Sequence, residues 1–190
     1  MTLEIAFANR PCRGETVSGD TVLVLERPPA ATLVVADGLG HGEKAALASQ
    51  TFCDFIGENH HMPLPALMKA ASRHSSHTRG AAAAIVRIDE QEEKLWFCGV
   101  GNIELQAISV HSIRPVCSPG IVGRPIRKIL QFDYPMASGD MVALYSDGIS
   151  SRFELKEYRS LGARECADAI LENHGKYHDD ATVLVARYRR

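Results

Sequence analysis

Apolar residues along the chain form short runs that are continuous or alternate with polar residues, and such runs are typical of strands. The run at 31–36 is of the kind found in a strand that is buried on both faces. We expect strands at residues 3–9, 21–25, 31–36, 81–88, 94–100, 103–110, 129–134, 141–145 and 181–186.

Other segments have apolar residues spaced three and four positions apart, which predicts amphipathic helices. In the first of them Ala45, Ala48 and Phe52 fall on one face. We expect helices at residues 43–56, from about 65 onward, and at 163–173. Gly175 follows the last helix and is a typical C-terminal cap.

The order of these elements predicts the fold class. Strands come first, two helices follow, and further strands precede a third helix and a last strand, without a regular βαβ alternation. This order favours an α+β fold with layered antiparallel sheets. Gly101-Asn102 separates two predicted strands and predicts a hairpin between them.

Composition narrows the function classes. The 190 residues are 45% hydrophobic and 23% charged, so we expect residues 1–190 to form a single globular domain. A formal net charge of −2 gives no electrostatic basis for binding nucleic acid. The longest wholly apolar run, 81–86, is too short to span a membrane, and no basic stretch precedes an apolar core near Met1, so we expect neither a membrane span nor a signal peptide. The five cysteines form no C-x-x-C pair, so we expect reduced thiols and a cytoplasmic location.

The candidate chemistry lies in four aspartates that stand at strand ends or in turns beside Gly or a second Asp. These are Asp20, Asp37, Asp147 and Asp179, the last followed by Asp180. Carboxylates gathered at one sheet edge repel each other unless a cation neutralises them. Oxygen ligands select Mg²⁺ or Mn²⁺ over zinc, and two such ions can activate a bridging water as a nucleophile.

The glycine-rich segment at 37–44 does not match the known phosphate-binding loops. Glu43 stands before Lys44 where a P-loop has Gly, and also where a dinucleotide-binding loop has its third Gly. We interpret the glycines as allowing the backbone to approach a metal ion, with the Gly38 carbonyl as a ligand.

Taken together, these motifs resemble a known family. Asp37-Gly-Leu-Gly-His-Gly-Glu, Gly139-Asp140 followed by Leu144-Tyr-Ser-Asp-Gly-Ile, and Asp179-Asp-Ala-Thr-Val-Leu-Val are similar to the metal-dependent PPM, or protein phosphatase 2C, family. Their order and spacing resemble the bacterial SpoIIE-type branch, and within it the small stressosome phosphatases. The resemblance extends from about residue 20 to 185.

The resemblance implies a four-layer α-β-β-α sandwich, with two antiparallel sheets flanked by antiparallel helices and without a large flap subdomain. It also implies two Mn²⁺ or Mg²⁺ ions, bridged by Asp37, with the Gly38 carbonyl on one ion and Asp147 and Asp179 on the other. Asp20 would contact the metal ions mainly through bound water, and Asp180 would contact the ligands rather than the metal ions.

The chain departs from the family pattern at three positions. Glu15 stands where many members have a phosphate-holding Arg, and Gly19 replaces an acidic residue. The usual histidine two residues after the Asp-Gly pair is absent, and His41 lies nearby instead. His41 is the candidate for the general acid that protonates the leaving oxygen, as an imidazole of near-neutral pKa can. The alternative is that this glycine-flanked histidine is a residue at a helix start that faces water.

We therefore expect a serine/threonine protein phosphatase that uses the metal-bridging hydroxide to attack phosphorus, with Asp37, Asp147, Asp179 and His41 in the catalytic centre. By resemblance, the substrates are phosphorylated STAS-domain proteins of a bacterial stressosome, and we expect a monomer without nucleic-acid or membrane partners. The alternatives are a phosphatase of an anti-anti-sigma factor, a catalytically silent phosphoprotein-binding module, and a hydrolase of small phosphate esters.

A basic loop is the candidate surface for recognising a protein substrate. The segment 118–128 is rich in proline and glycine, and Arg114, Arg124, Arg127 and Lys128 lie in or near it. These side chains could meet an acidic phosphorylated surface.

Overall fold

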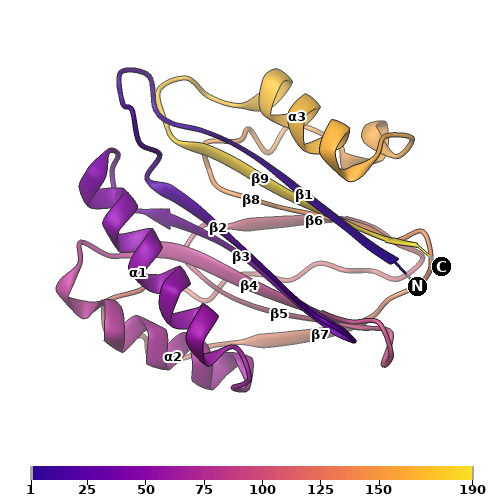
Figure 1. Cartoon of the computed structure of the whole chain (residues 1–190), viewed down its shortest axis with the longest axis horizontal. Coiled ribbons are helices and arrows are strands. Elements are labelled where there is room, and N and C mark those ends of the chain that lie inside the picture. Colours follow the sequence, from indigo (N-terminus) through magenta and orange to yellow (C-terminus); the bar gives the residue numbers. More distant parts are fainter. Residues whose placement is uncertain (1, 190) are drawn as a thin grey trace.

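The computed structural model describes residues 2–189 and contains two antiparallel sheets that pack face to face (Figure 1). The first sheet has the order β1-β9-β8-β6, with β1 Thr2–Arg10, β9 Ala181–Arg189, β8 Met141–Tyr145 and β6 Glu104–Ile108. The second has the order β2-β3-β4-β5-β7, with β2 Asp20–Arg27, β3 Ala30–Gly38, β4 Ala81–Asp89, β5 Lys94–Val100 and β7 Gln131–Pro135.

Helices cover the outer face of each sheet. Helices α1 (Glu43–Asn59) and α2 (Leu64–His74) lie over the second sheet, and α3 (Ala163–His174) lies over β1 and β9 (Figure 1). The 3₁₀ turns Ser75–His77 and Leu155–Tyr158 complete the described helical segments. The expected α+β class and α-β-β-α layering are confirmed. Within residues 2–189, α3 is the α-helix that covers the first sheet.

Three apolar layers hold these elements together. The central layer fills the space between the sheets and includes the buried side chains Leu33, Phe97, Leu144 and Leu184. The second layer joins α1 and α2 to the outer face of their sheet, and the third lies under α3. Burial of this apolar surface is the main favourable contribution to folding. The predicted inner face of α1 is confirmed, because Phe52 is fully buried there.

The hairpin predicted at Gly101-Asn102 is wrong. Strand β5 pairs with β4 and β7 in the second sheet, whereas β6 pairs with β8 in the first sheet. The chain therefore crosses between sheets at this point. Gly101 has a φ of 97°, and a Cβ there would lie 2.6 Å from the Cβ of Ala82, so the crossing needs a glycine. The predicted strand at 103–110 is shorter in the structure, where it covers Glu104–Ile108.

None of the helices in residues 2–189 is both long and apolar enough to cross a membrane. The five cysteines all lie in this part of the chain and are free thiols, as the sequence predicts.

Candidate active site

The aspartates that the sequence singles out lie where strands of both sheets end. Asp20 begins β2 and is the direct cross-strand partner of Asp37, which precedes the last residue of β3. In the first sheet Tyr145, the last residue of β8, pairs with Val183 near the start of β9. Asp147 follows β8 and Asp179 precedes β9, so antiparallel pairing brings both to the same end of that sheet.

Asp20 is buried and only half satisfied by the protein. Its Oδ2 accepts a hydrogen bond of 2.6 Å from the Ser146 hydroxyl, which links the two sheets. Its Oδ1 is buried and has no hydrogen-bond partner within residues 2–189. Burial raises the pKa of Asp20 to about 7. A buried carboxylate oxygen without a donor costs free energy unless a proton or a cation meets it.

Asp37 lies in the most negative surroundings. Burial, followed by the charges of Asp20, Asp147, Asp179 and Asp180, raises the pKa of Asp37 to about 9. The pKa of Asp179 is also raised, by burial and then by Asp147. The structure thus brings together the aspartates of both sheets, close enough for each to oppose ionisation of another.

Asp147 is more exposed and is held by neighbours that the sequence did not single out. Its Oδ2 accepts a hydrogen bond of 2.7 Å from the side-chain amide of Asn102, the residue at the sheet-to-sheet crossing. Its backbone carbonyl accepts a bond of 2.5 Å from the Lys176 ammonium group. Nothing in the local pattern around Asn102 or Lys176 indicates these contacts, because each partner is far away in sequence.

Asp180 supports the loop before β2. Its Oδ1 accepts a hydrogen bond of 2.8 Å from the backbone N–H of Cys12, while its buried Oδ2 has no protein partner in the described chain. A Cβ on Gly19 would lie 2.6 Å from that Oδ2. The absence of a side chain at Gly19 therefore lets the loop pack against Asp180.

Two Asp-Gly pairs need glycine for close packing. A Cβ on Gly38 would lie 1.9 Å from the carbonyl oxygen of Ala45, and one on Gly148 would lie 1.8 Å from that of Asp180. No rotamer change can relieve a collision with backbone. The glycines therefore allow helix α1 and the loop before β9 to approach the strand ends that carry Asp37 and Asp147.

His41 lies at the rim, outside the group of aspartates that shift the pKa of Asp37. Its Nδ1 is 2.6 Å from Oε1 of Glu15, and 59% of its side chain is exposed. Glu15, the residue that departs from the family pattern, is thus the partner of the candidate general acid. The loop that carries Glu15 is fixed to the β9 side of the site by the bond from Cys12 to Asp180.

The donor set fits a hydrated divalent cation. Asp20 and Asp180 each have a buried oxygen without a protein partner, and every side-chain ligand offered is a carboxylate. No group of three or more His, Cys, Asp or Glu side chains within residues 2–189 is arranged to hold a metal ion by itself, so an ion bound here would keep part of its water shell. Mg²⁺ usually keeps several waters and needs only one or two carboxylates, so an open arrangement suits it.

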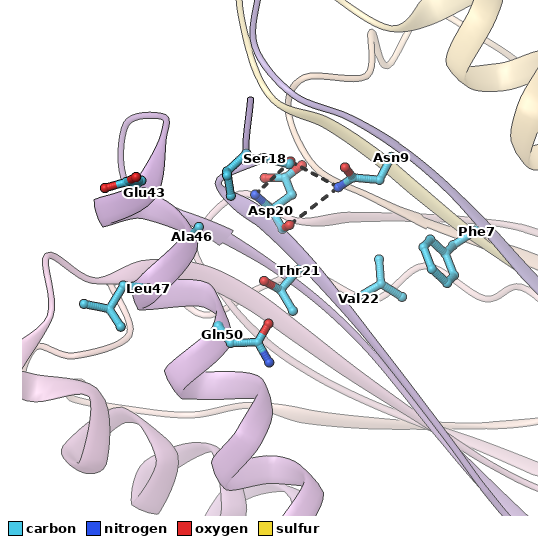
Figure 2. A pocket seen from close by; sticks show the side chains of 11 residues that line it. Phe7, Asn9, Ser18, Asp20, Thr21, Val22, Glu43, Ala46, Leu47 and Gln50 are labelled. Carbon is cyan, nitrogen blue, oxygen red and sulfur yellow. Dashed lines mark hydrogen bonds between the residues drawn. The ribbon is translucent and has the colours of Figure 1, made fainter. Parts of the chain in front are cut away.

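A groove of about 600 Å³ adjoins the site on the side of β1 and α1. Figure 2 shows Asp20 and Asn9 at one end of it and Phe7 and Val22 farther along. The side-chain amide of Asn9 donates to the Ser18 hydroxyl at 3.1 Å and to the backbone carbonyl of Asp20 at 3.5 Å. These bonds join the edge strands of the two sheets at the site.

Comparison with known proteins decides the family. The profile described as Stage II sporulation protein E (SpoIIE) matches residues 28–189. The chain belongs to the SpoIIE family. Among characterised relatives, it is 22% identical over 179 residues to phosphoserine phosphatase RsbX of Bacillus subtilis (strain 168), covering 92% of this chain and 89% of that protein.

Solved structures agree with this assignment. One, from work on the bacterial stressosome as a modular system adapted to control secondary messenger signalling, is 32% identical with a TM-score of 0.93 and covers 98% of this chain and 100% of that chain. The structure of RsbX in complex with magnesium is 20% identical with a TM-score of 0.86, covering 97% and 94% of the two chains. This SpoIIE-family member is a metal-dependent protein phosphatase of the PP2C type.

Proposed function

We propose that this phosphatase removes phosphate from phosphoserine or phosphothreonine in STAS-domain proteins of a bacterial stressosome, in the cytoplasm. Two observations support the substrate class. The curated relative is named a phosphoserine phosphatase, and the most similar of the structures reported above comes from work on the stressosome. We also propose that residues 1–190 form one phosphatase domain that uses two Mn²⁺ or Mg²⁺ ions.

The observation that carries the proposal is the cross-strand pair of Asp20 and Asp37. Asp147 and Asp179, at the strand ends of the other sheet, lie close enough for their charges to raise the pKa of Asp37. We assign Asp37, Asp147, Asp179 and the Gly38 carbonyl as metal ligands, and Asp20 as a ligand that acts through water. When bound, the divalent ions would stabilise the charge of the phosphoryl group and lower the pKa of the attacking water.

The chain's own groups would orient this chemistry. The Ser146 hydroxyl fixes one oxygen of Asp20 and leaves the other free to face a hydrated cation. The Asn102 amide holds Asp147 in a similar way. Second-sphere hydrogen bonds of this kind commonly set the orientation and basicity of ligands.

We assign His41 the role of general acid. The bond between its Nδ1 and Glu15 leaves Nε2 free to deliver a proton to the departing serine or threonine oxygen. The carboxylate at Nδ1 orients the imidazole ring for this transfer, as an aspartate does in a hydrolase triad.

The deciding experiment is phosphate release from a phosphorylated STAS-domain protein of the same organism. We expect release with Mn²⁺ and none in excess chelator. Binding of the phosphoprotein without release would indicate a silent binding module. Turnover of small phosphate esters together with failure on the phosphoprotein would indicate a small-ester hydrolase.

A further inference from the structure

A line of cationic side chains leads from the candidate active site to a cleft beside α2. The Arg79 guanidinium donates a hydrogen bond of 3.0 Å to the backbone carbonyl of Leu39, two residues after Asp37. The Arg124 guanidinium in turn donates to the carbonyl of Arg79 at 3.3 Å. The cleft has a volume of about 560 Å³ and is lined by Lys69, Ser72, Arg73, Ser76, Gly123, Arg124, Pro125 and Ile126.

The cleft lies within reach of a protein that is docked at the site. The N–H of Leu39 bonds to the carbonyl of Gly80 at 2.9 Å, and Ala81 pairs with Val122. These three backbone segments lie side by side like neighbouring strands, so the cleft begins about 10 Å from Leu39. A protein partner covers a patch roughly 30 Å across. A protein substrate whose phosphoryl group is at Asp37 is therefore large enough to reach the cleft.

The cationic side chains of the cleft differ in how many hydrogen bonds and ion pairs they make within the protein. The Arg124 guanidinium donates to the backbone carbonyls of Ser76, Thr78, Arg79 and Gly123, which fixes the wall of the cleft. Lys69 and Arg73 are exposed and stand one turn apart on α2, and neither takes part in an ion pair in the described part of the chain. Their charges are thus available to a partner.

We propose that this cleft binds acidic side chains of the phosphoprotein substrate, placed three or more residues from the phosphorylated residue. This inference rests on the proposed phosphatase function. An extended chain advances about 3.3 Å per residue, so a gap of about 10 Å corresponds to roughly three residues. Lys69 and Arg73 attract acidic groups at this distance from the phosphoserine. This charge pattern selects and orients the substrate.

The test uses synthetic phosphoserine peptides that carry a run of five identical residues starting three positions from the phosphoserine. The run lies either before or after the phosphoserine, and in each position it consists of Glu in one peptide and of Gln in its counterpart. At low salt we expect the wild-type enzyme to prefer one Glu peptide over its Gln counterpart by about tenfold in kcat/KM. The preference should shrink at high salt. It should disappear in K69E/R73E, and most of it should disappear in the milder K69Q/R73Q.

The matched control is R27E/K94E, which makes the same change of charge at the opposite end of the second sheet. Register pairs Arg27 with Ala30 and Lys94 with Asp89, far from the strand ends that carry Asp20 and Asp37. This control should keep the preference for the Glu peptide, and every variant should turn over 4-nitrophenyl phosphate at the wild-type rate.

Two results would overturn the inference: no preference in the wild-type enzyme, or a preference that survives in K69E/R73E. A wild-type protein without Mn²⁺-dependent turnover of 4-nitrophenyl phosphate would instead contradict the proposed function. The two failures are therefore distinguishable.

Discussion

Asp20 and Asp37 face each other directly across β2 and β3, so a buried and a partly buried carboxylate lie side by side at the end of these strands. Like charges directly opposite each other on neighbouring strands are destabilising. Burial raises the pKa of Asp20 to about 7, and burial together with the charge of Asp20 raises that of Asp37 to about 9. The metal-free protein therefore holds protons at this pair under neutral conditions, where a bound cation would replace them.

The first prediction concerns stability against pH in the metal-free protein. Both folded-state pKa values lie above the ordinary value of 3.8, so the folded state binds more protons than the unfolded state as pH rises. The free energy of unfolding should therefore fall from about pH 4 through pH 7 and on to about pH 9. Thermal unfolding in excess chelator across this range measures the effect.

Asp37→Asn is the matched variant for that measurement. It removes the group with the larger shift, so its melting temperature in chelator should fall less steeply with pH than that of the wild type. Saturating Mn²⁺ should flatten the wild-type curve as well, because the cation offsets the repulsion. A wild-type protein that becomes more stable between pH 5 and pH 8 in chelator contradicts the prediction.

The second prediction concerns the assigned ligands. Asp147→Asn should lower kcat by at least ~10²-fold at saturating Mn²⁺ while the protein stays folded, because charge stabilisation is the largest catalytic contribution. Zn²⁺ should replace Mn²⁺ poorly, since the site offers oxygen ligands alone. The control is Asp133→Asn on β7, an exposed aspartate outside the site that should keep full activity. Near-normal turnover by Asp147→Asn would remove Asp147 from the ligand set.

The third prediction contrasts two glycines. Gly38→Ala should destabilise the protein by at least ~3 kcal/mol or prevent folding, because the added Cβ would meet the Ala45 carbonyl at 1.9 Å. Gly57→Ala, inside α1, should stabilise it by ~0.5–1 kcal/mol, because the nearest atom to the new Cβ is Leu23 Cδ2 at 4.0 Å. Chemical denaturation of both variants checks the pair, and equal effects would refute the packing interpretation.

The fourth prediction tests the general acid through the leaving group. His41→Gln should lower kcat on phenyl phosphate by ~10²-fold or more, but on 4-nitrophenyl phosphate by less than ~tenfold, since a good leaving group needs no proton. Glu15→Gln should show the same pattern with a smaller loss, and Glu15→Asp should restore part of it. Equal losses on both esters would show that His41 acts in some way other than by proton transfer.

Much of the fold follows from local pattern in the sequence. The strand at 94–100 and the inner face of α1 follow from apolar periodicity, which depends only on near neighbours. The aspartates at strand ends can likewise be recognised in the sequence. A carboxylate directly after an apolar run needs a proton, a cation or solvent to stabilise it, so its position suggests a function. The family motifs then indicated which chemistry such a group supports.

Which elements meet is decided by contacts between residues far apart in sequence. The strand after Gly101-Asn102 has the same local pattern whether it pairs with β5 or with β8. Its pairing with β8 depends on packing against residues that are distant in sequence. The Glu15–His41 pair and the cleft beside α2, which the segment 123–126 completes, also join parts of the chain that are far apart in sequence. The sequence by itself therefore determined the elements and the chemical type of the site. Tertiary structure decided the partners of each charged group, because packing across the two sheets, rather than spacing along the chain, sets those distances.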